Sequence, residues 1–424
     1  VVEAIVERLE PKRDLVRALE AVVAPGAIIA TNTSSLSVTA IAAAAERPER
    51  VAGYHFFNPV PAMKLVEVIR GAHTAIDVER ALVDLAGRFG HRAVLAADTP
   101  GFIVNHAGRE FGTEALAMLR EGVASVSEID AVLRDAAGFR MGPFELMDLT
   151  GLDVSHPVME SIYDQFYQDP RYRPSGIAAQ RVAAGLLGRK TGRGFYAYEG
   201  ARQIAEPRQA VTGDLPASVA VVADNEAGEM RQLLVAAGHR VSSNPDEVAD
   251  GLVLVGLEGE DVAGAAVRLG LPASSCVGFD PYFGLDRHWT LVASAATSGK
   301  AKASALALAA ATGRKATLVD DSCGAICQRV VAMIVNIGSE IRAEDRIRRG
   351  RGRRRQAGPR LSPRTAGMGA QARRRAHPAD TGHDLRSRTR PPLQGKPLAA
   401  APGRTWTCAR RPNRTGGRLI GPEA

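Results

Sequence analysis

Two ionisable side chains lie in apolar stretches from which a buried strand would normally exclude them. His55 falls within VAGYHFF and Glu67 within KLVEVIR, and a Pro-rich connection separates the two stretches. If they pair as antiparallel strands around Pro61, positions equally distant from Pro61 lie opposite each other, which brings the Cβ atoms of His55 and Glu67 within about 5 Å. A carboxylate there fixes the tautomer of an imidazole and raises its basicity, so the pair predicts a general base. The alternative is a structural histidine with an accidental neighbour.

A polar turn is expected next to this pair. IIATNTSSLS (28–37) leads from a buried strand into polar residues, at the carboxyl end of a parallel sheet, where open α/β folds bind ligands. Asn32, Ser34 and Ser35 are its candidate hydrogen-bonding groups. The alternative is that TNTSS only caps a helix beginning at Val38.

The elements that must position these groups follow a recognisable pattern. Residues 1–97 alternate short apolar strands with amphipathic helices, which predicts a parallel α/β sheet containing one hairpin. From Asp98 the pattern becomes helical, with Asp98 or Thr99 as the expected cap and Pro100 in the first turn. Asn105 then falls in the second turn of that helix and is able to face the crevice of the sheet. A packing or solvent-facing role is its alternative.

The chain also contains an imperfect internal repeat. GHRAVLAADTPGFIVN, from Gly90, aligns with GRKATLVDDSCGAICQ, from Gly313, and AGYHFFNP aligns with VGFDPYFG. The second copy is expected to have lost the candidate chemistry. In the alignment Asp280 replaces His55, Gln328 replaces Asn105, and Glu67 falls near Ala293.

Composition bounds the class of protein. The chain has 424 residues, 45% of them hydrophobic, which is enough for two or three globular domains. The sequence has no apolar stretch of membrane-spanning length and no signal-peptide pattern, so we expect a cytoplasmic protein without membrane contact. Four cysteines are too few for a disulfide framework, and the spacing of Cys323 and Cys327 is more typical of helix packing than of a metal site.

Charge divides the chain into an acidic body and a basic tail. The net charge is +8, but residues 342–424 hold 22 basic and five acidic residues, while residues 1–341 hold 32 basic and 41 acidic ones. The tail lacks apolar periodicity and interleaved aromatic residues. We therefore expect a disordered segment without a specific nucleic-acid partner, although basic tails are able to bind nucleic acid.

Five motifs carry a family resemblance. NTSSL, GYHFFNPVPAMKLVEVI, DTPGFIVN, GFRMGPFELMDLTGLD and GRKTGRGFYAY occur in this order over residues 1–200. In this respect the chain resembles the 3-hydroxyacyl-CoA dehydrogenases, oxidoreductases that convert 3-hydroxyacyl-CoA to 3-oxoacyl-CoA with NAD. The degenerate second copy resembles the long bacterial subgroup, which includes 3-hydroxybutyryl-CoA and 3-hydroxyadipyl-CoA dehydrogenases of fatty-acid and phenylacetate breakdown.

The resemblance implies residue roles. His55 would remove the proton of the 3-hydroxyl group, and Glu67 would orient His55. Ser34 and Asn105 would hydrogen-bond the hydroxyl or the forming carbonyl group. The resemblance also implies an acyl-CoA substrate, no metal and a homo-oligomeric intact enzyme. Four residues would lie along bound NAD: Glu7, Lys12, Asn32 and Asn58.

The expected fold is α/β: a partial Rossmann-type domain, an all-α domain, and a second, degenerate Rossmann-like unit with a disordered Arg-rich tail. The sequence does not determine the acyl chain length of the substrate, the choice between NAD and NADP, or the size of the oligomer. The expected segments are 1–97 (NAD-binding domain, C-terminal part), 98–199 (helical domain), 200–216 (linker), 217–320 (degenerate repeat), 321–341 (start of a second helical domain) and 342–424 (tail).

Two expectations concern the ends of these domains. No Gly-rich phosphate-binding turn precedes Val1, and the second copy has Ala223, Asn225 and Gly228 at the three glycine positions, so we expect an N-terminally truncated enzyme with weak affinity for NAD. The repeat pattern stops near Ile341, which suggests a frameshifted or mispredicted C-terminus.

Three other functions compete with this interpretation. Ser34, His55 and Glu67 are the residue types of a hydrolase triad, although no G-x-S-x-G motif is present. The chain would otherwise be a non-catalytic assembly module, or a dehydrogenase of another short hydroxyacid.

Overall fold

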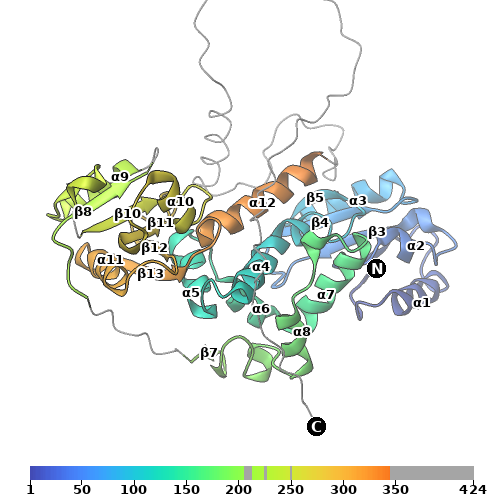
Figure 1. The fold of residues 1–424 in the computed structure, drawn as a ribbon. Helices are drawn as coiled ribbons and strands as arrows, with labels where there is room; N and C mark the ends of the chain where they lie inside the picture. Colours follow the sequence, from blue (N-terminus) through green and yellow to red (C-terminus); the bar gives the residue numbers. More distant parts are fainter. Residues whose placement is uncertain (205–212, 224–226, 249–250, 344–424) are drawn as a thin grey trace, which may run out of the picture. The chain divides into compact units, whose positions relative to one another are not determined.

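A computed structural model describes residues 1–204, 213–223, 227–248 and 251–343 (Figure 1). Nearly all of the predicted tail falls outside these residues. The described part contains two sheets that are mostly parallel, and a group of helices follows the first sheet in the chain. The predicted α/β fold class is therefore confirmed.

The first sheet has the order β1-β2-β3-β4-β5, and all its neighbours are parallel except the hairpin of β3 and β4. Apolar residues of the strands pack on one face against Val78 and Leu82 of α3, and on the other against Val16 of α1 and Ile41 of α2. The elements are β1 (Val2–Glu3), α1 (Leu9–Glu20), β2 (Ile29–Thr31), α2 (Val38–Ala42), β3 (Val51–Phe56), β4 (Leu65–Arg70), α3 (Ile76–Arg88) and β5 (Arg92–Ala97).

The helical segment begins later than predicted. Asp98 caps α2 rather than the helix that follows it, because its carboxylate accepts hydrogen bonds from Val38 N at 2.8 Å and Thr39 N at 2.7 Å. Gly101 and Phe102 then adopt positive φ values of 70° and 51°. A right-handed helix requires negative φ values, so it cannot include these two residues. The helices are α4 (Val104–Glu121), α5 (Val126–Ala131), α6 (Pro143–Thr150), α7 (Leu152–Gln165) and α8 (Gly176–Ala183), with a short β6–β7 hairpin (Tyr198–Glu199, Arg202–Gln203) after them.

The second sheet repeats the architecture of the first. Its order is β13-β12-β11-β10-β8-β9, and β11, β12 and β13 pair as β3, β4 and β5 do. Asp321 accepts a hydrogen bond from Val262 N at 2.8 Å, as Asp98 does from Val38 N. The elements are β8 (Val219–Val222), α9 (Ala227–Ala236), β9 (Val241–Ser242), β10 (Leu252–Gly256), α10 (Val262–Leu269), β11 (Cys276–Phe279), β12 (His288–Ala293), α11 (Gly299–Ala311), β13 (Lys315–Asp320) and α12 (Ile326–Ala343).

The register of the second hairpin corrects one part of the alignment. Phe279 lies opposite Leu291, and Asp280 N donates to Thr290 O at 3.1 Å. Thr290, not Ala293, therefore stands where Glu67 stands in the first copy. Gln328, the counterpart of Asn105, donates from Nε2 to Asp280 Oδ1 at 3.0 Å, so this copy holds no imidazole–carboxylate pair at that place.

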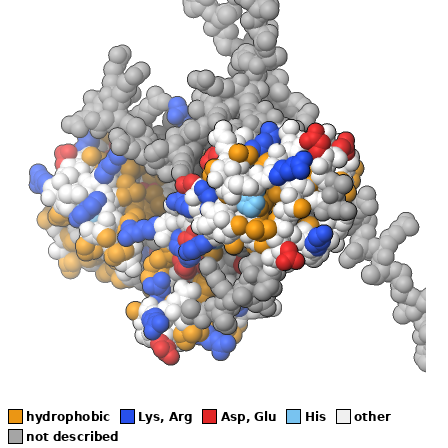
Figure 2. All heavy atoms as spheres, turned by 90° about the vertical axis from the view of Figure 1, so that its left-hand side faces the viewer, with side chains coloured by type: hydrophobic (Ala, Val, Ile, Leu, Met, Phe, Trp, Pro, Cys, Tyr) orange, Lys and Arg blue, Asp and Glu red, His pale blue; other side chains and the backbone are white. Residues whose placement is uncertain are grey.

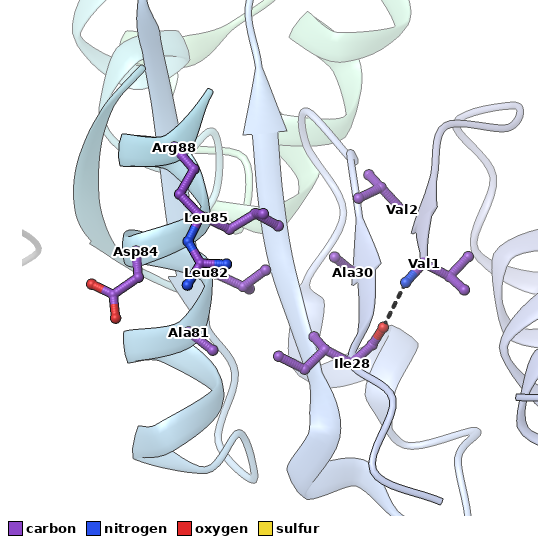
Figure 3. A pocket seen from close by; sticks show the side chains of 9 residues that line it. All are labelled: Val1, Val2, Ile28, Ala30, Ala81, Leu82, Asp84, Leu85 and Arg88. Carbon is purple, nitrogen blue, oxygen red and sulfur yellow. Dashed lines mark hydrogen bonds between the residues drawn. The ribbon is translucent and has the colours of Figure 1, made fainter. Parts of the chain in front are cut away.

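A pocket of about 330 Å³ opens between the first two strands and α3 (Figure 3). It is lined mostly by apolar side chains, including Val2, Ala30 and Leu85, with Asp84 and Arg88 near its rim. It includes the starts of β1 and β2, whereas ligands of open α/β sheets bind at the carboxyl ends of the strands. We therefore assign this pocket no part in the chemistry.

Candidate active site

The predicted cross-strand pair is present at the centre of the first sheet. His55 of β3 lies directly opposite Glu67 of β4, and His55 Nδ1 is 2.8 Å from Glu67 Oε2. Both residues are buried, with 3% of His55 and none of Glu67 exposed. Burial strengthens the interaction between the two groups, because less water competes for it.

The second oxygen of Glu67 is also occupied. Glu67 Oε1 accepts hydrogen bonds from Ile103 N and Val104 N, each at 2.9 Å, at the N-terminus of α4. Free backbone N–H groups at a helix start favour a carboxylate. Because a carboxylate only accepts hydrogen bonds, His55 Nδ1 carries the proton and His55 Nε2 offers a lone pair.

Ser34 completes the chain of contacts on the other side of the imidazole. Ser34 Oγ is 3.2 Å from His55 Nε2, and Asn105 Nδ2 donates to Ser34 O at 3.1 Å. Asn105 is the second residue of α4, so it lies in the first turn rather than the predicted second. The structure thus brings all four residues predicted to be catalytic to one place.

The carboxylate of Glu7, which the family resemblance places beside the cofactor, stabilises the turn 32–35. Glu7 Oε1 accepts from Ser34 N at 2.7 Å, Ser35 N at 2.9 Å and Thr33 Oγ1 at 2.7 Å. Asn32 Oδ1 accepts from Phe56 N at 2.8 Å and so ties the turn to β3.

The other two residues predicted to contact the cofactor differ in exposure. Lys12 is only 1% exposed, and its Nζ donates to Glu3 Oε2 at 3.0 Å. Asn58 is exposed and precedes a cis peptide bond to Pro59. Contact of Glu7, Lys12, Asn32 and Asn58 with NAD stays a prediction.

Aromatic rings enclose the imidazole. The ring centroids of Phe57 and Phe102 lie 4.6 and 5.8 Å from that of His55. Sequence reasoning did not assign a role to either ring. Phe102 is buried and has a positive φ. Its place beside His55 follows from the Gly101–Phe102 turn, which delays the start of α4 and which the sequence pattern did not predict.

Comparisons with known proteins show which family this sequence belongs to. Residues 1–99 match the family model described as 3-hydroxyacyl-CoA dehydrogenase, NAD binding domain, and residues 101–198 match its C-terminal domain. A 3-hydroxyadipyl-CoA dehydrogenase of Escherichia coli (strain K12) is 38% identical over 337 residues, which is 79% of this chain and 66% of that relative. A 3-hydroxybutyryl-CoA dehydrogenase of Bradyrhizobium diazoefficiens is 44% identical, over 48% of this chain and 69% of that relative.

A solved structure has a similar overall fold. The crystal structure of 3-hydroxybutyryl-CoA dehydrogenase from Escherichia coli K12 superposes with a TM-score of 0.67 at 37% identity, and the match covers 82% of this chain and 69% of that one. The chain thus spans about two thirds of the length of these relatives, and slightly less for the 3-hydroxyadipyl-CoA dehydrogenase. Both domain models of the family match in order, and relatives of the family share sequence identity and fold with this chain. The chain therefore belongs to the 3-hydroxyacyl-CoA dehydrogenase family.

Proposed function

We propose that this chain carries the proton-transfer machinery for NAD-dependent oxidation of (3S)-3-hydroxyacyl-CoA to 3-oxoacyl-CoA. The observation that carries the proposal is the continuous hydrogen-bonded series from α4 through Glu67 and His55 to Ser34. Family membership and the names of the relatives support the same reaction.

Each residue of the site has a separate role in the oxidation of the alcohol. A substrate hydroxyl group within hydrogen-bond reach of both Ser34 Oγ and His55 Nε2 gives its proton to Nε2, and Glu67 stabilises the imidazolium that forms. Ser34 and Asn105 hold the oxygen as it becomes a carbonyl oxygen, which fixes the position of C3. Bound NAD supplies the acceptor for the hydride that leaves C3.

The chain offers a fitting surface for part of that cofactor. The turn 32–35 follows β2 at the carboxyl end of the sheet, where dinucleotides bind in this type of fold. The Glu7 side chain is 31% exposed, and its Oε2 is 3.6 Å from Lys12 Nζ, so this oxygen is able to accept hydrogen bonds from ribose hydroxyl groups. The cytoplasmic location and homo-oligomeric state expected from the sequence remain predictions.

Figure 2 shows no continuous basic surface on the face that it draws. Lys and Arg side chains are separated there by acidic, apolar and other side chains. None of the helices in the described ranges is both long and apolar enough to span a membrane.

The triad-like geometry makes a hydrolase the obvious competitor. A serine hydrolase uses the backbone N–H groups at and after its nucleophile to stabilise an oxyanion. Here Ser34 N and Ser35 N both donate to Glu7 Oε1, so a carboxylate occupies the place that an oxyanion would need. The geometry favours alcohol oxidation over acyl transfer.

One assay separates the two reactions. We expect the chain, with saturating NAD, to form NADH from (3S)-3-hydroxybutyryl-CoA while the amount of free CoA thiol stays constant. Release of CoA thiol without NADH would support a hydrolase instead. If neither product forms, the proposed activity does not belong to this chain.

A further inference from the structure

Two backbone carbonyl groups of the turn 32–35 accept hydrogen bonds from the helices that follow the first sheet. Asn105 Nδ2 of α4 donates to Ser34 O at 3.1 Å, and Gln165 Nε2 of α7 donates to Ser35 O at 2.7 Å. Ser35 is only 2% exposed, so little water reaches it to replace a lost donor. Of the two amides, only that of Asn105 is part of the proposed proton-transfer machinery, although the contact of Gln165 is the shorter one.

The amide of Gln165 has a fixed orientation. Its Nε2 also donates to Ser161 O at 3.1 Å and to Ser161 Oγ at 3.0 Å, one helical turn earlier. The carbonyl oxygens of Ser35 and Ser161 only accept hydrogen bonds, so the NH₂ group and not the amide oxygen faces them. Gln165 is the last residue of α7, and the ring of the next residue, Phe166, stacks on Tyr172 with centroids 4.3 Å apart. The donor is therefore held in place beside the turn.

The peptide group that follows Ser35 is held on both of its sides. Leu36 N donates to Thr33 Oγ1 at 3.0 Å, which is a contact inside the turn, and Ser35 O accepts from Gln165, which is a contact to α7. Peptide groups are planar, so a rotation of this group also moves the backbone of the residues before it. Gln165 therefore restrains the turn from the side of the helices.

The Ser34 hydroxyl group is sensitive to a movement of this backbone. Ser34 Oγ is 3.2 Å from His55 Nε2, which is already long for a hydrogen bond. A displacement of about 0.5 Å would take the two atoms beyond hydrogen-bond distance. Small movements at residue 34 or 35 therefore decide whether serine and imidazole reach the same substrate oxygen.

We propose that Gln165 is a positioning residue for the reaction: its amide fixes the backbone at Ser35 so that the Ser34 hydroxyl group lies beside His55 Nε2 and the substrate oxygen. Gln165 acts through Ser34 and not on the substrate. This inference rests on the proposed function, in which C3 lies beside Ser34 and His55. Because one neutral hydrogen bond is at stake, the expected change in rate is about 3- to 10-fold.

Gln165→Met tests the proposal, since it removes the donor and keeps the length of the side chain. With saturating NAD we expect kcat for (3S)-3-hydroxybutyryl-CoA to fall about 3- to 10-fold, with KM within about twofold. In a Ser34→Ala chain the same substitution should lower kcat by less than about 1.5-fold, because the hydroxyl group that Gln165 positions is gone. Gln180→Met, at an exposed position of α8, is the matched control and should keep the wild-type kcat.

A second measurement needs no turnover. With ¹⁵N-labelled histidine and a neutral ring, loss of the hydrogen bond from Ser34 changes the chemical shift of His55 Nε2. Gln165→Met should move this shift by at least half of the change that Ser34→Ala causes, and Gln180→Met should leave it unchanged. If the wild-type chain forms no NADH but this shift occurs, the proposed function is wrong and the positioning role of Gln165 stands.

Three results would overturn the positioning role. The first is an equal loss of kcat from Gln165→Met with and without the Ser34 hydroxyl group, which indicates a general structural effect. The second is a His55 Nε2 shift that stays at its wild-type value in Gln165→Met, and the third is no change of that shift in Ser34→Ala. If Gln165→Met does not fold, Gln165→Glu takes its place in both measurements, because it has nearly the same shape and no donor at neutral pH.

Discussion

Replacing His55 by Gln should lower kcat for (3S)-3-hydroxybutyryl-CoA oxidation by about 10³-fold, because His55 is the one general base that the described residues place beside Ser34 and Asn105. Gln is close to His in size, and its amide is able to accept the hydrogen bond that Ser34 Oγ is placed to make at 3.2 Å. Substrate binding should therefore change little, with KM within about threefold. Steady-state NADH formation at several substrate concentrations separates the two parameters.

His91→Gln is the matched control for this variant. His91 lies beside the same sheet, and its ring nitrogens are 3.2 and 3.3 Å from backbone carbonyl oxygens of Phe89 and Val60. Its kcat should stay within twofold of the wild-type value. A His55→Gln chain that is folded and keeps more than a tenth of the wild-type kcat would show that His55 is not the base.

Glu67→Gln should be nearly as damaging, with kcat lower by about 10²- to 10³-fold. The side-chain amide has one acceptor oxygen, whereas Glu67 accepts on both oxygens, from α4 and from His55. If that oxygen faces Ile103 N and Val104 N, the NH₂ group faces His55 Nδ1 and forces the ring proton onto Nε2. The base is then blocked although every residue of the site except Glu67 is retained.

The same substitution should also reduce stability. In that orientation the amide keeps all three contacts of Glu67, but hydrogen bonds to a charged carboxylate become bonds to a neutral group. This exchange costs about 1–2 kcal/mol, measurable by urea unfolding followed by circular dichroism. Asp84→Asn, at an exposed position of α3, is the control and should change the free energy of unfolding by less than about 0.5 kcal/mol. A Glu67→Gln chain with wild-type kcat would show that catalysis does not depend on Glu67 keeping the ring proton on His55 Nδ1.

Local pattern was enough to predict the centre of this site. The alternation of apolar residues on both sides of Pro61 fixes which residues of β3 and β4 face each other, and His55 and Glu67 are opposite as predicted. The polar turn after β2 was also predictable from local pattern. A buried parallel strand ends where the sequence changes from apolar to polar residues, and ligands bind at that end of the sheet. Ser34 therefore lies where the sequence placed it.

Contacts between distant segments could not be predicted in this way. Asp98 reads as the cap of the helix that follows it, but it is bound to the N-terminus of α2, about 60 residues earlier. The start of α4 therefore moves to Val104, where its free N–H groups meet Glu67. The family resemblance likewise implied a place for Glu7 beside the cofactor but not its hydrogen bonds to Thr33, Ser34 and Ser35.

The protonation of one ring nitrogen is the central claim, and NMR measures it directly. In a chain carrying ¹⁵N-labelled histidine, the signals that disappear in His55→Gln belong to His55. At a pH where the ring is neutral, Nδ1 should give the shift of a protonated nitrogen and Nε2 that of an unprotonated one. The opposite pattern, with the proton on Nε2, would contradict the proposed role of Glu67 and leave the substrate hydroxyl without a base.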